Sequence, residues 1–162
     1  MDEIDYYDTL PKKRIGALML FLDEQERILL VKPTYRLDWL LPGGTVEGDE
    51  SPLQAALREV QEEVHLTVMR TRLLCIDYVA KTSERGESLQ FVFYGGVLSS
   101  NQIASIVLPE DELAEYRLVP LHVACTLTSL KLARRLSASL QALHQDTTVF
   151  LEDGETPDIC QF

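Results

Sequence analysis

The sequence predicts a single α/β domain in which a mixed β-sheet packs against two helices. Its 162 residues fall within the usual size of one domain. Hydrophobic residues make up 46% of the chain and charged residues 25%, which is ordinary for a globular protein. Short β-type runs surround two segments of helical periodicity, an order typical of a sheet covered by helices. We therefore expect one domain over residues 1–151 and an acidic C-terminal tail over residues 152–162.

The first elements are a β-hairpin and a glycine-containing loop. Ile15–Leu22 and Ile28–Lys32 are β-type runs joined by a polar loop, a pattern that predicts a hairpin. Leu37–Leu41 is expected to be a short extended segment that ends at Pro42-Gly43-Gly44. The two glycines have no side chains, so a ligand can approach the backbone of this loop closely.

Residues 51–64 show strong signals of a helix. Ser51 and Gln54 form the Ser-x-x-Gln pattern of a capping box, and Pro52 suits the first helical position. Apolar residues then recur at helical spacing, so one face of the helix is expected to pack on the sheet. These residues are Leu53, Ala56, Leu57, Val60 and Val64.

The rest of the chain continues the alternation of strands and helices. A polar turn over Lys81–Glu87 separates two β-type runs. A second long helix is expected over Thr128–His144, because leucines recur there at helical spacing. The other expected segments are strands at Leu66–Val79, Leu89–Leu98, Arg117–Val119 and Thr147–Leu151, a turn or short helix at Pro109–Glu112, and a turn at Pro120.

The charge of the chain excludes some classes of partner. It has 26 acidic residues against 15 Lys and Arg, a formal net charge of −11. Nucleic-acid polymers and anionic membranes bind proteins chiefly through Lys and Arg, so neither is expected as a partner. A small phosphorylated ligand stays compatible with this balance, because a bound metal ion reverses the local field.

The cysteines and the N-terminus favour a cytoplasmic location. The acidic start of the chain lacks the basic residues and the apolar stretch of a secretory signal. Cys75, Cys125 and Cys160 are odd in number and widely spaced. This pattern favours reduced thiols over a disulfide framework or a zinc site.

The segment from Gly43 to Leu66 carries the candidate chemistry. Glu59, Glu62 and Glu63 lie three and four positions apart, which puts their carboxylates on one face of a helix. Like charges at this spacing, near a helix C-terminus, are unfavourable unless a cation offsets them. Carboxylate oxygens are ligands that Mg²⁺ or Mn²⁺ prefers, so a metal site is predicted. The alternative is a solvated acidic face without a ligand.

This segment resembles the Nudix box, whose pattern is G-x5-E-x7-R-E-U-x-E-E-x-G-U with U an apolar residue. Gly44, Glu50 and the run from Arg58 to Leu66 have the spacing of the box over 23 residues. Trp39 to Gly44 and Glu47-Gly48 are also similar to its usual lead-in. The resemblance implies an α/β/α sandwich with a mixed sheet. It also implies a MutT-like hydrolase that cleaves the pyrophosphate linkage of a nucleoside diphosphate derivative.

The resemblance implies roles for individual residues of the box. Glu62 and Glu63 are expected to bind Mg²⁺ or Mn²⁺ directly, and Glu59 directly or through water. The carbonyl of Gly43 is a further expected ligand. Arg58 is expected to serve catalysis together with Glu59 and Glu62, by orienting the glutamates through ion pairs.

Two positions of the box are expected to be structural. Glu50 is expected to stabilise the unit of loop and helix. His65 stands where the family has Gly, just past the helix, at a position that usually has a left-handed backbone. His enters that region more readily than most residues other than Gly, so we expect a strained C-cap costing about 1 kcal/mol. The alternative is a His65 that touches phosphate or senses pH.

The box does not fix the general base or the contacts to the substrate. Trp39 is the preferred candidate for the flat apolar wall that a nucleobase requires. Arg36 and Lys32 are candidates to hold phosphate, and the backbone of Gly44 is expected to approach the substrate. The candidates for the base are Glu59, Glu62, Glu84, Glu87, Glu110, Glu112 and Glu115.

The expected substrate is a small nucleotide, namely a nucleoside di- or triphosphate, oxidised ones included. The proline and tryptophan motifs of the ADP-ribose and NADH subfamilies are absent from the sequence. The alternative is a catalytically silent Nudix-like module that binds a nucleotide for regulation, although such modules commonly lack box glutamates that are all present here. Nudix proteins are often dimers, which leaves a homodimer open.

Overall fold

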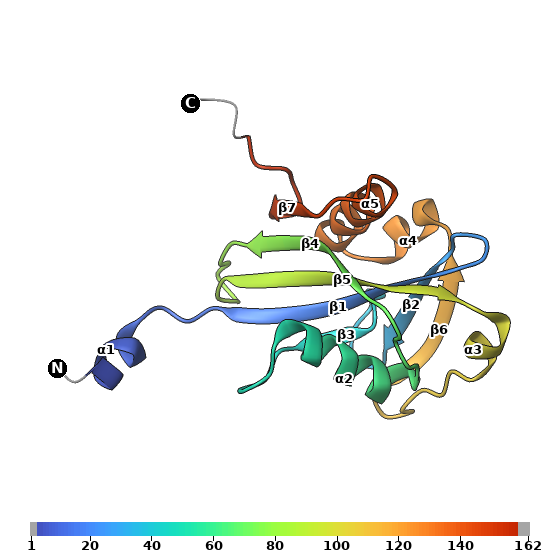
Figure 1. Cartoon of the computed structure of the whole chain (residues 1–162), viewed down its shortest axis with the longest axis horizontal. Helices are drawn as coiled ribbons and strands as arrows, with labels where there is room; N and C mark the ends of the chain where they lie inside the picture. Colours follow the sequence, from blue (N-terminus) through green and yellow to red (C-terminus); the bar gives the residue numbers. More distant parts are fainter. Residues whose placement is uncertain (1–2, 159–162) are drawn as a thin grey trace.

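The computed structural model describes residues 3–158 and has the expected α/β fold (Figure 1). Seven strands form one mixed sheet in the order β6-β2-β1-β5-β4-β7, and β3 pairs with β1. The strands are β1 (Arg14–Asp23), β2 (Ile28–Pro33), β3 (Gly43–Thr45), β4 (Arg72–Val79), β5 (Ser88–Leu98), β6 (Leu113–Val119) and β7 (Val149–Glu152). The helices are α1 (Glu3–Thr9), α2 (Pro52–Val64), α3 (Ser100–Ala104), α4 (Leu121–Leu127) and α5 (Leu130–His144). The first two and the last four residues, with Cys160 and the end of the expected tail, lie outside the described part.

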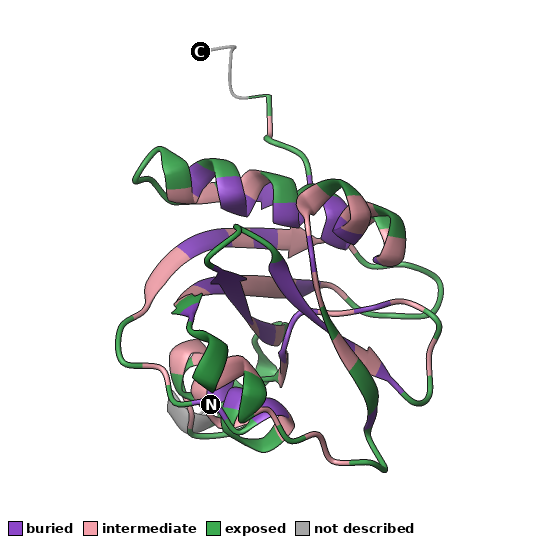
Figure 2. Ribbon diagram, turned by 90° about the vertical axis from the view of Figure 1, so that its right-hand side faces the viewer, coloured by how far each residue is buried: buried purple, intermediate pink, exposed green. Residues whose placement is uncertain are grey.

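Helices cover both faces of the sheet, and a hydrophobic core fills each side (Figure 2). On one side, Met19 and Phe21 of β1 pack against Val60 of α2. On the other side, Leu20 of β1 packs against Leu136 of α5. The residues of β1 alternate between the two cores because successive side chains of a strand point to opposite faces. The expected α/β/α sandwich is confirmed.

Strand β1 lies at the centre of the sheet and has three partners. It pairs antiparallel with β2 and runs parallel to β5 over its whole length, from Arg14 opposite Ser88 onward. Its first half also pairs antiparallel with β3, where Gly16 lies opposite Thr45. The glycine loop is therefore fixed by backbone hydrogen bonds to the central strand.

Helix α2 begins as the sequence predicts. The Ser51 hydroxyl accepts a hydrogen bond from the backbone N–H of Gln54 at 3.1 Å, and the Gln54 side chain accepts one from the Ser51 N–H at 2.8 Å. Pro52 occupies the first turn. These bonds satisfy N–H groups that have no partner within the helix. The helix ends at His65, whose backbone is left-handed with φ 55° and ψ 32°.

Several boundaries differ from the sequence prediction. β4 begins at Arg72 and not at Leu66, because Leu66 is buried beneath α2 and the following residues form a loop. In the segment 37–41, only Leu40 makes a β-bridge, to Val31. β6 begins four residues before the expected Arg117. The short helices α3 and α4 were not predicted, since one is a single turn and the other begins at Pro120 without a side-chain cap.

The first residues after β7 are held against the fold. Lys131 on α5 pairs with Asp153 at 2.7 Å, and Arg134 pairs with Glu155 at 2.8 Å. The backbone N–H of Asp153 donates to the carbonyl of Tyr78 at 2.7 Å. The expected tail therefore contributes its first residues to the packing of α5 and β4.

A buried ion pair joins the same elements. Asp77 of β4 is fully buried and accepts hydrogen bonds from Nε and Nη2 of Arg135 on α5, at 2.9 and 2.7 Å. Its other oxygen accepts one from the backbone N–H of Gly154 at 3.0 Å. Both carboxylate oxygens are thus satisfied, as a buried charge requires.

Candidate active site

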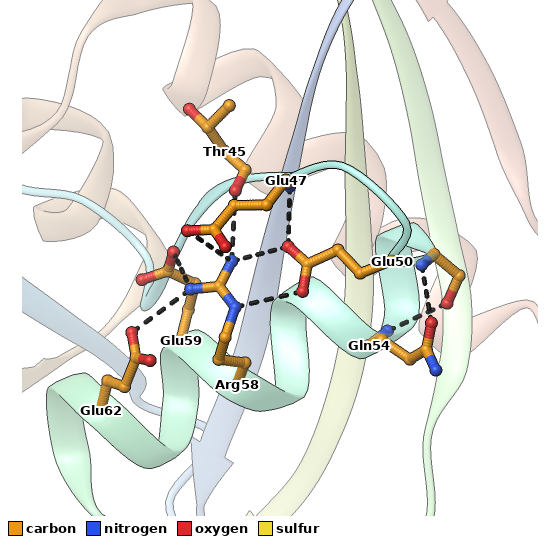
Figure 3. Close-up of polar contacts among 8 residues, drawn as sticks. Thr45, Glu47, Glu50, Gln54, Arg58, Glu59 and Glu62 are labelled. Carbon is orange, nitrogen blue, oxygen red and sulfur yellow. Dashed lines mark hydrogen bonds and ion pairs between the residues drawn. The ribbon is translucent and has the colours of Figure 1, made fainter.

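Arg58 is the centre of a polar network on α2 (Figure 3). Its Nε and Nη2 donate to the two oxygens of Glu50 at 3.1 and 2.7 Å, which is a two-pronged contact. Its Nη1 donates to Glu59 at 2.8 Å and to Glu62 at 3.3 Å. A further bond from Nη2 reaches the carbonyl of Thr45 at 3.3 Å. Arg58 thus links the helix, the preceding loop and β3.

The pairing shifts the pKa values of both partners in opposite directions. Hydrogen bonding from Arg58 lowers the pKa of Glu50. The hydrogen bond to Glu50, followed by the one to Glu59, raises the pKa of Arg58. Both groups therefore stay charged across the physiological range, which keeps the network intact.

Glu63 lies on the side of α2 that faces the glycine loop. Its carboxylate accepts a hydrogen bond from the backbone N–H of Gly43 at 2.8 Å. Burial raises its pKa to about 8, and the negative charges of Glu59, Glu112 and Glu62 add to that effect. Burial also raises the pKa of Glu59, although Arg58 opposes the shift. Burial and mutual repulsion thus disfavour the charged forms of Glu59 and Glu63, and a cation in this cluster would stabilise those charged forms.

Both glycines of the loop are required by close approach. Gly43 has φ +145°, and a Cβ at this position would lie 2.2 Å from the carbonyl oxygen of Ala17. A Cβ at Gly44 would lie 2.4 Å from Oε1 of Glu59. Any side chain at Gly44 would push the Glu59 carboxylate away from the loop. The sequence indicated that the backbone of this loop allows close approach, but not that the carboxylate of Glu59 lies against Gly44.

The donors of this cluster suit a divalent cation in type and in charge. Glu59, Glu62 and Glu63 offer hard carboxylate oxygens, and Glu47 and Glu50 add two more negative charges around the single Arg58. Within residues 3–158, no three acidic, His or Cys side chains already converge on a common point. Glu59 and Glu62 turn instead toward Arg58, and Glu63 turns toward Gly43. The residues therefore fit Mg²⁺ or Mn²⁺ once these carboxylates rotate.

A cleft of about 420 Å³ opens on the other side of the glycine loop. Gly43, Gly44 and Thr45 form one wall of the cleft, and Arg36, which the sequence analysis names as a candidate substrate contact, also lines it. Its floor is the sheet at Gly16 and Gln90. The sequence prediction missed the other basic residues of the lining, which are Arg14, Arg85, Lys131 and Arg135. They come from three separate segments, namely β1, the turn before β5 and helix α5, and no local pattern links the three.

Trp39 does not form the expected wall for a nucleobase. Its side chain is 6% exposed and belongs to the core beneath α4 and α5. The guanidinium of Arg117 covers its ring at 4.8 Å. The backbone N–H of Trp39 also donates to Leu127, which fixes the residue in the core. The prediction fails because a large aromatic side chain before a loop gains more from burial than from exposure to solvent.

Lys32 and His65 have structural partners. Lys32 donates to the carbonyls of Arg36 and Leu37, so it braces the loop rather than holding phosphate. The left-handed backbone of His65 is that of the expected strained cap. Its Nδ1 also lies 2.9 Å from the carbonyl of Val107, a contact that the sequence did not indicate.

Among the later glutamates considered as a base, Glu112 lies near the cluster. Its charge raises the pKa of both Glu59 and Glu63. Glu87 pairs instead with Lys13 and accepts a hydrogen bond from Tyr78. Glu115 pairs with Arg117 at 2.7 Å. Sequence spacing could not have separated Glu112 from the others, because β6 brings it to the site by pairing with β2.

The box spacing, the sheet and the helix that carries the glutamates together match a known family. The sequence profile of the NUDIX domain covers residues 12–141. The chain belongs to the NUDIX family. It is 37% identical over 96 residues to the mouse protein "8-oxo-dGDP phosphatase NUDT18", an alignment that covers 54% of this chain and 28% of the relative. It is 43% identical over 72 residues to the rat "Diphosphoinositol polyphosphate phosphohydrolase 2", covering 43% of this chain and 40% of the relative.

Solved structures of NUDIX proteins share the fold. The MutT protein of Methanosarcina mazei Go1 is 24% identical with a TM-score of 0.63, and the match covers 85% of this chain and 99% of that one. The NUDIX domain of NrtR from Shewanella oneidensis, solved with ADP ribose, is 18% identical with a TM-score of 0.67, covering 88% and 99%. This NUDIX chain matches well under half the length of the curated relatives above. Over residues 3–158, none of its helices has the length and hydropathy needed to cross a bilayer.

Proposed function

We propose that this NUDIX hydrolase depends on a divalent metal and cleaves a phosphoanhydride bond in a nucleoside di- or triphosphate or a related derivative, oxidised nucleotides included. The observation that carries the proposal is the position of Glu59 and Glu63 of α2 beside the glycine loop that also forms a wall of the cleft, with Glu62 joined to Glu59 through Arg58. A substrate in the cleft would thus lie next to the carboxylates.

Glu59, Glu62, Glu63 and the carbonyl of Gly43 would hold Mg²⁺ or Mn²⁺. When bound, the metal would neutralise phosphoryl oxygens and lower the pKa of a coordinated water. Arg58 keeps Glu59 and Glu62 on one side of the helix through its two contacts from Nη1. Glu50 in turn fixes the guanidinium of Arg58, so it acts as a positioning residue.

The chain offers three candidates to accept the proton of the attacking water, namely Glu59, Glu62 and Glu112. The raised pKa of Glu59 makes it a better base near neutral pH than an exposed carboxylate. Cys75 is not part of the chemistry in this proposal, because burial raises the pKa of its thiol to about 12. Its free thiol and that of Cys125 accord with a cytoplasmic location.

The first experiment is hydrolysis of a nucleotide panel with Mg²⁺, with and without a chelator. Orthophosphate and pyrophosphate are measured, and 8-oxo-dGDP is included because a relative is named for it. We expect release that the chelator abolishes. If no orthophosphate or pyrophosphate is released from any nucleotide of the panel, the result would favour the alternative, a catalytically silent nucleotide-binding module with regulatory function.

The second experiment tests the metal residues. Glu62→Gln removes one carboxylate that is exposed and outside the core, so the variant should fold normally. We expect kcat to fall about 100-fold or more, as for the loss of a charge in a metal site. Glu24→Gln, which removes an exposed carboxylate from the β1–β2 loop, is the matched control and should keep full activity. Near-normal turnover by Glu62→Gln would refute the metal assignment.

A further inference from the structure

The charged side chains that line the cleft beside the glycine loop are all basic. Among the described residues, five basic side chains and no carboxylate contribute to its wall. The whole chain has a formal net charge of −11, so the positive charge of the cleft is opposite in sign to the net charge of the protein. A cleft lined by one sign of charge concentrates ligands of the other sign.

The five cations are not equivalent, because two of them already have acidic partners. Arg135 is neutralised by Asp77, and Lys131 pairs with Asp153. Within residues 3–158, the guanidinium groups of Arg14 and Arg85 have no ion pair or hydrogen bond, although the backbone N–H of Arg85 donates to Oγ1 of Thr82. Arg36 has one long contact, 3.9 Å from Asp38. The net positive charge therefore comes from Arg14, Arg36 and Arg85.

Two of these cations lie at the end of the cleft away from the glycine loop. Arg14 begins β1, and its register partner is Ser88 at the start of β5. Arg85 lies in the turn that precedes Ser88, so both arginines flank the same end of the sheet. Between this end and the loop, the side chain of Gln90 lies across Gly16, where a Cβ would be 2.2 Å from Oε1 of the Gln90 amide.

The cleft also lacks the surface that a nucleobase needs for stacking. Trp39 is buried in the core, and the one aromatic residue of the described lining is Tyr35, which is 77% exposed. Stacking gains most of its energy from a ring held in a desolvated wall. A highly exposed tyrosine on a loop offers little of that gain.

We infer that the cleft binds a part of the substrate that bears additional phosphate groups, beyond the phosphoanhydride that is cleaved. The inference rests on the proposed function for the position of the reacting bond. Arg14 and Arg85 contact the remote phosphates, and Arg36 contacts those nearer the glycine loop. Guanidinium groups suit this role because their donors match two phosphate oxygens at once. Such a substrate is either a nucleotide with a further phosphate on the sugar or a polyphosphorylated ring without a base.

Binding is tested first, with inositol hexakisphosphate and no metal, by isothermal titration calorimetry. This probe has several phosphate monoesters and no anhydride, so it cannot be consumed. We compare the unaltered protein with the double variant Arg14→Gln/Arg85→Gln and with Arg70→Gln. Arg70 is an exposed arginine outside the cleft, so its variant controls for the loss of a positive charge elsewhere on the surface, although it removes one charge and the double variant removes two. We expect the double variant to bind about tenfold more weakly and Arg70→Gln to bind nearly as the unaltered protein.

Turnover is tested with ADP and adenosine 3′-phosphate 5′-diphosphate, which differ only in one remote phosphate, and with a diphosphoinositol pentakisphosphate. We expect higher kcat/KM for either probe with extra phosphates than for ADP, and the better of the two identifies the source. In the double variant, KM for that probe should rise about tenfold with kcat nearly unchanged, as expected when uniform binding is lost. KM for ADP should stay within about twofold.

The outcomes separate this inference from the proposed function. Unaltered hexakisphosphate binding by the double variant, or a preference for ADP, would overturn the inference while leaving hydrolysis intact. Hexakisphosphate binding that depends on Arg14 and Arg85, without metal-dependent hydrolysis of any probe, would support the polyphosphate site and refute the proposed function.

Discussion

The ion pair between Asp77 and Arg135 yields a quantitative prediction for Asp77→Asn. The amide keeps the shape of the side chain and can still accept from Gly154, but it leaves the guanidinium of Arg135, which is 6% exposed, without a counter-charge. Removing one partner of a buried pair costs about 3–5 kcal/mol. For a domain of this size, each kcal/mol lowers Tm by about 2–4 °C, so Tm should fall by roughly 6–20 °C. Thermal and urea unfolding followed by circular dichroism measure both quantities.

The matched control is Asp146→Asn, the same chemical change at an exposed pair. Asp146 pairs with Arg72, but its side chain is 92% exposed. Its substitution should therefore lower the free energy of unfolding by less than about 1 kcal/mol. If Asp77→Asn also costs less than about 1 kcal/mol, burial does not strengthen the pair and the reasoning fails. The variant Asp77→Leu/Arg135→Met removes both charges and should be at least as stable as Asp77→Asn.

Three further predictions follow from the site. Burial raises the pKa of Glu63 from 4.5 to about 8. In the metal-free protein, the contribution of Glu63 to the free energy of unfolding should therefore be greatest below pH 4.5 and should be lost as the pH rises to about 8. Glu63→Gln should flatten the dependence of Tm on pH, and an unchanged slope would contradict it. His65→Gly relieves a left-handed backbone but loses the contact to Val107, two effects of about 1 kcal/mol each, so Tm should change little. His65→Ala loses the contact without relief and should unfold at lower temperature than His65→Gly. Gly44→Ala should reduce kcat at least tenfold while Tm falls by only a few degrees, because it displaces the carboxylate of Glu59; normal kcat would show that this displacement does not matter.

Local signals were sufficient for much of the fold. The Ser51 capping box and the helical periodicity after it predicted α2, and the alternation of β-type runs predicted the mixed sheet. α3 also has a Ser-x-x-Gln capping box, at Ser99 and Gln102, so a signal was present in the sequence. α4 had no comparable signal, because its N-cap is Pro120. The start of β4 was misplaced because an apolar residue such as Leu66 can be buried by a loop as well as by a strand.

The site also contains a part that local sequence signals predict and a part that they do not. Glu59, Glu62 and Glu63 share one helix with Arg58, so their spacing alone predicted a common face. The lining of the cleft depends on long-range strand pairing, because the register of β1 and β5 brings Arg14 and Arg85 to the same end of the cleft. Glu112 reaches the box only because β6 pairs with β2. Sequence spacing cannot specify neighbours that come together through strand pairing. For Trp39, the sequence could not distinguish a ring that lines a ligand cleft from a ring that packs in the core.

The parallel pairing of β1 with β5 has a consequence for the order of folding. β1 lies next to β5 along its whole length, yet α2 and β4 intervene in the chain. During synthesis, the central strand must therefore wait for its main neighbour until the chain has been made as far as Leu98. Closing so long a loop makes the nucleation of the sheet slow. Helix α2 can form its cap locally and earlier, so the glutamates would be arranged on their helix before the cleft that they serve exists.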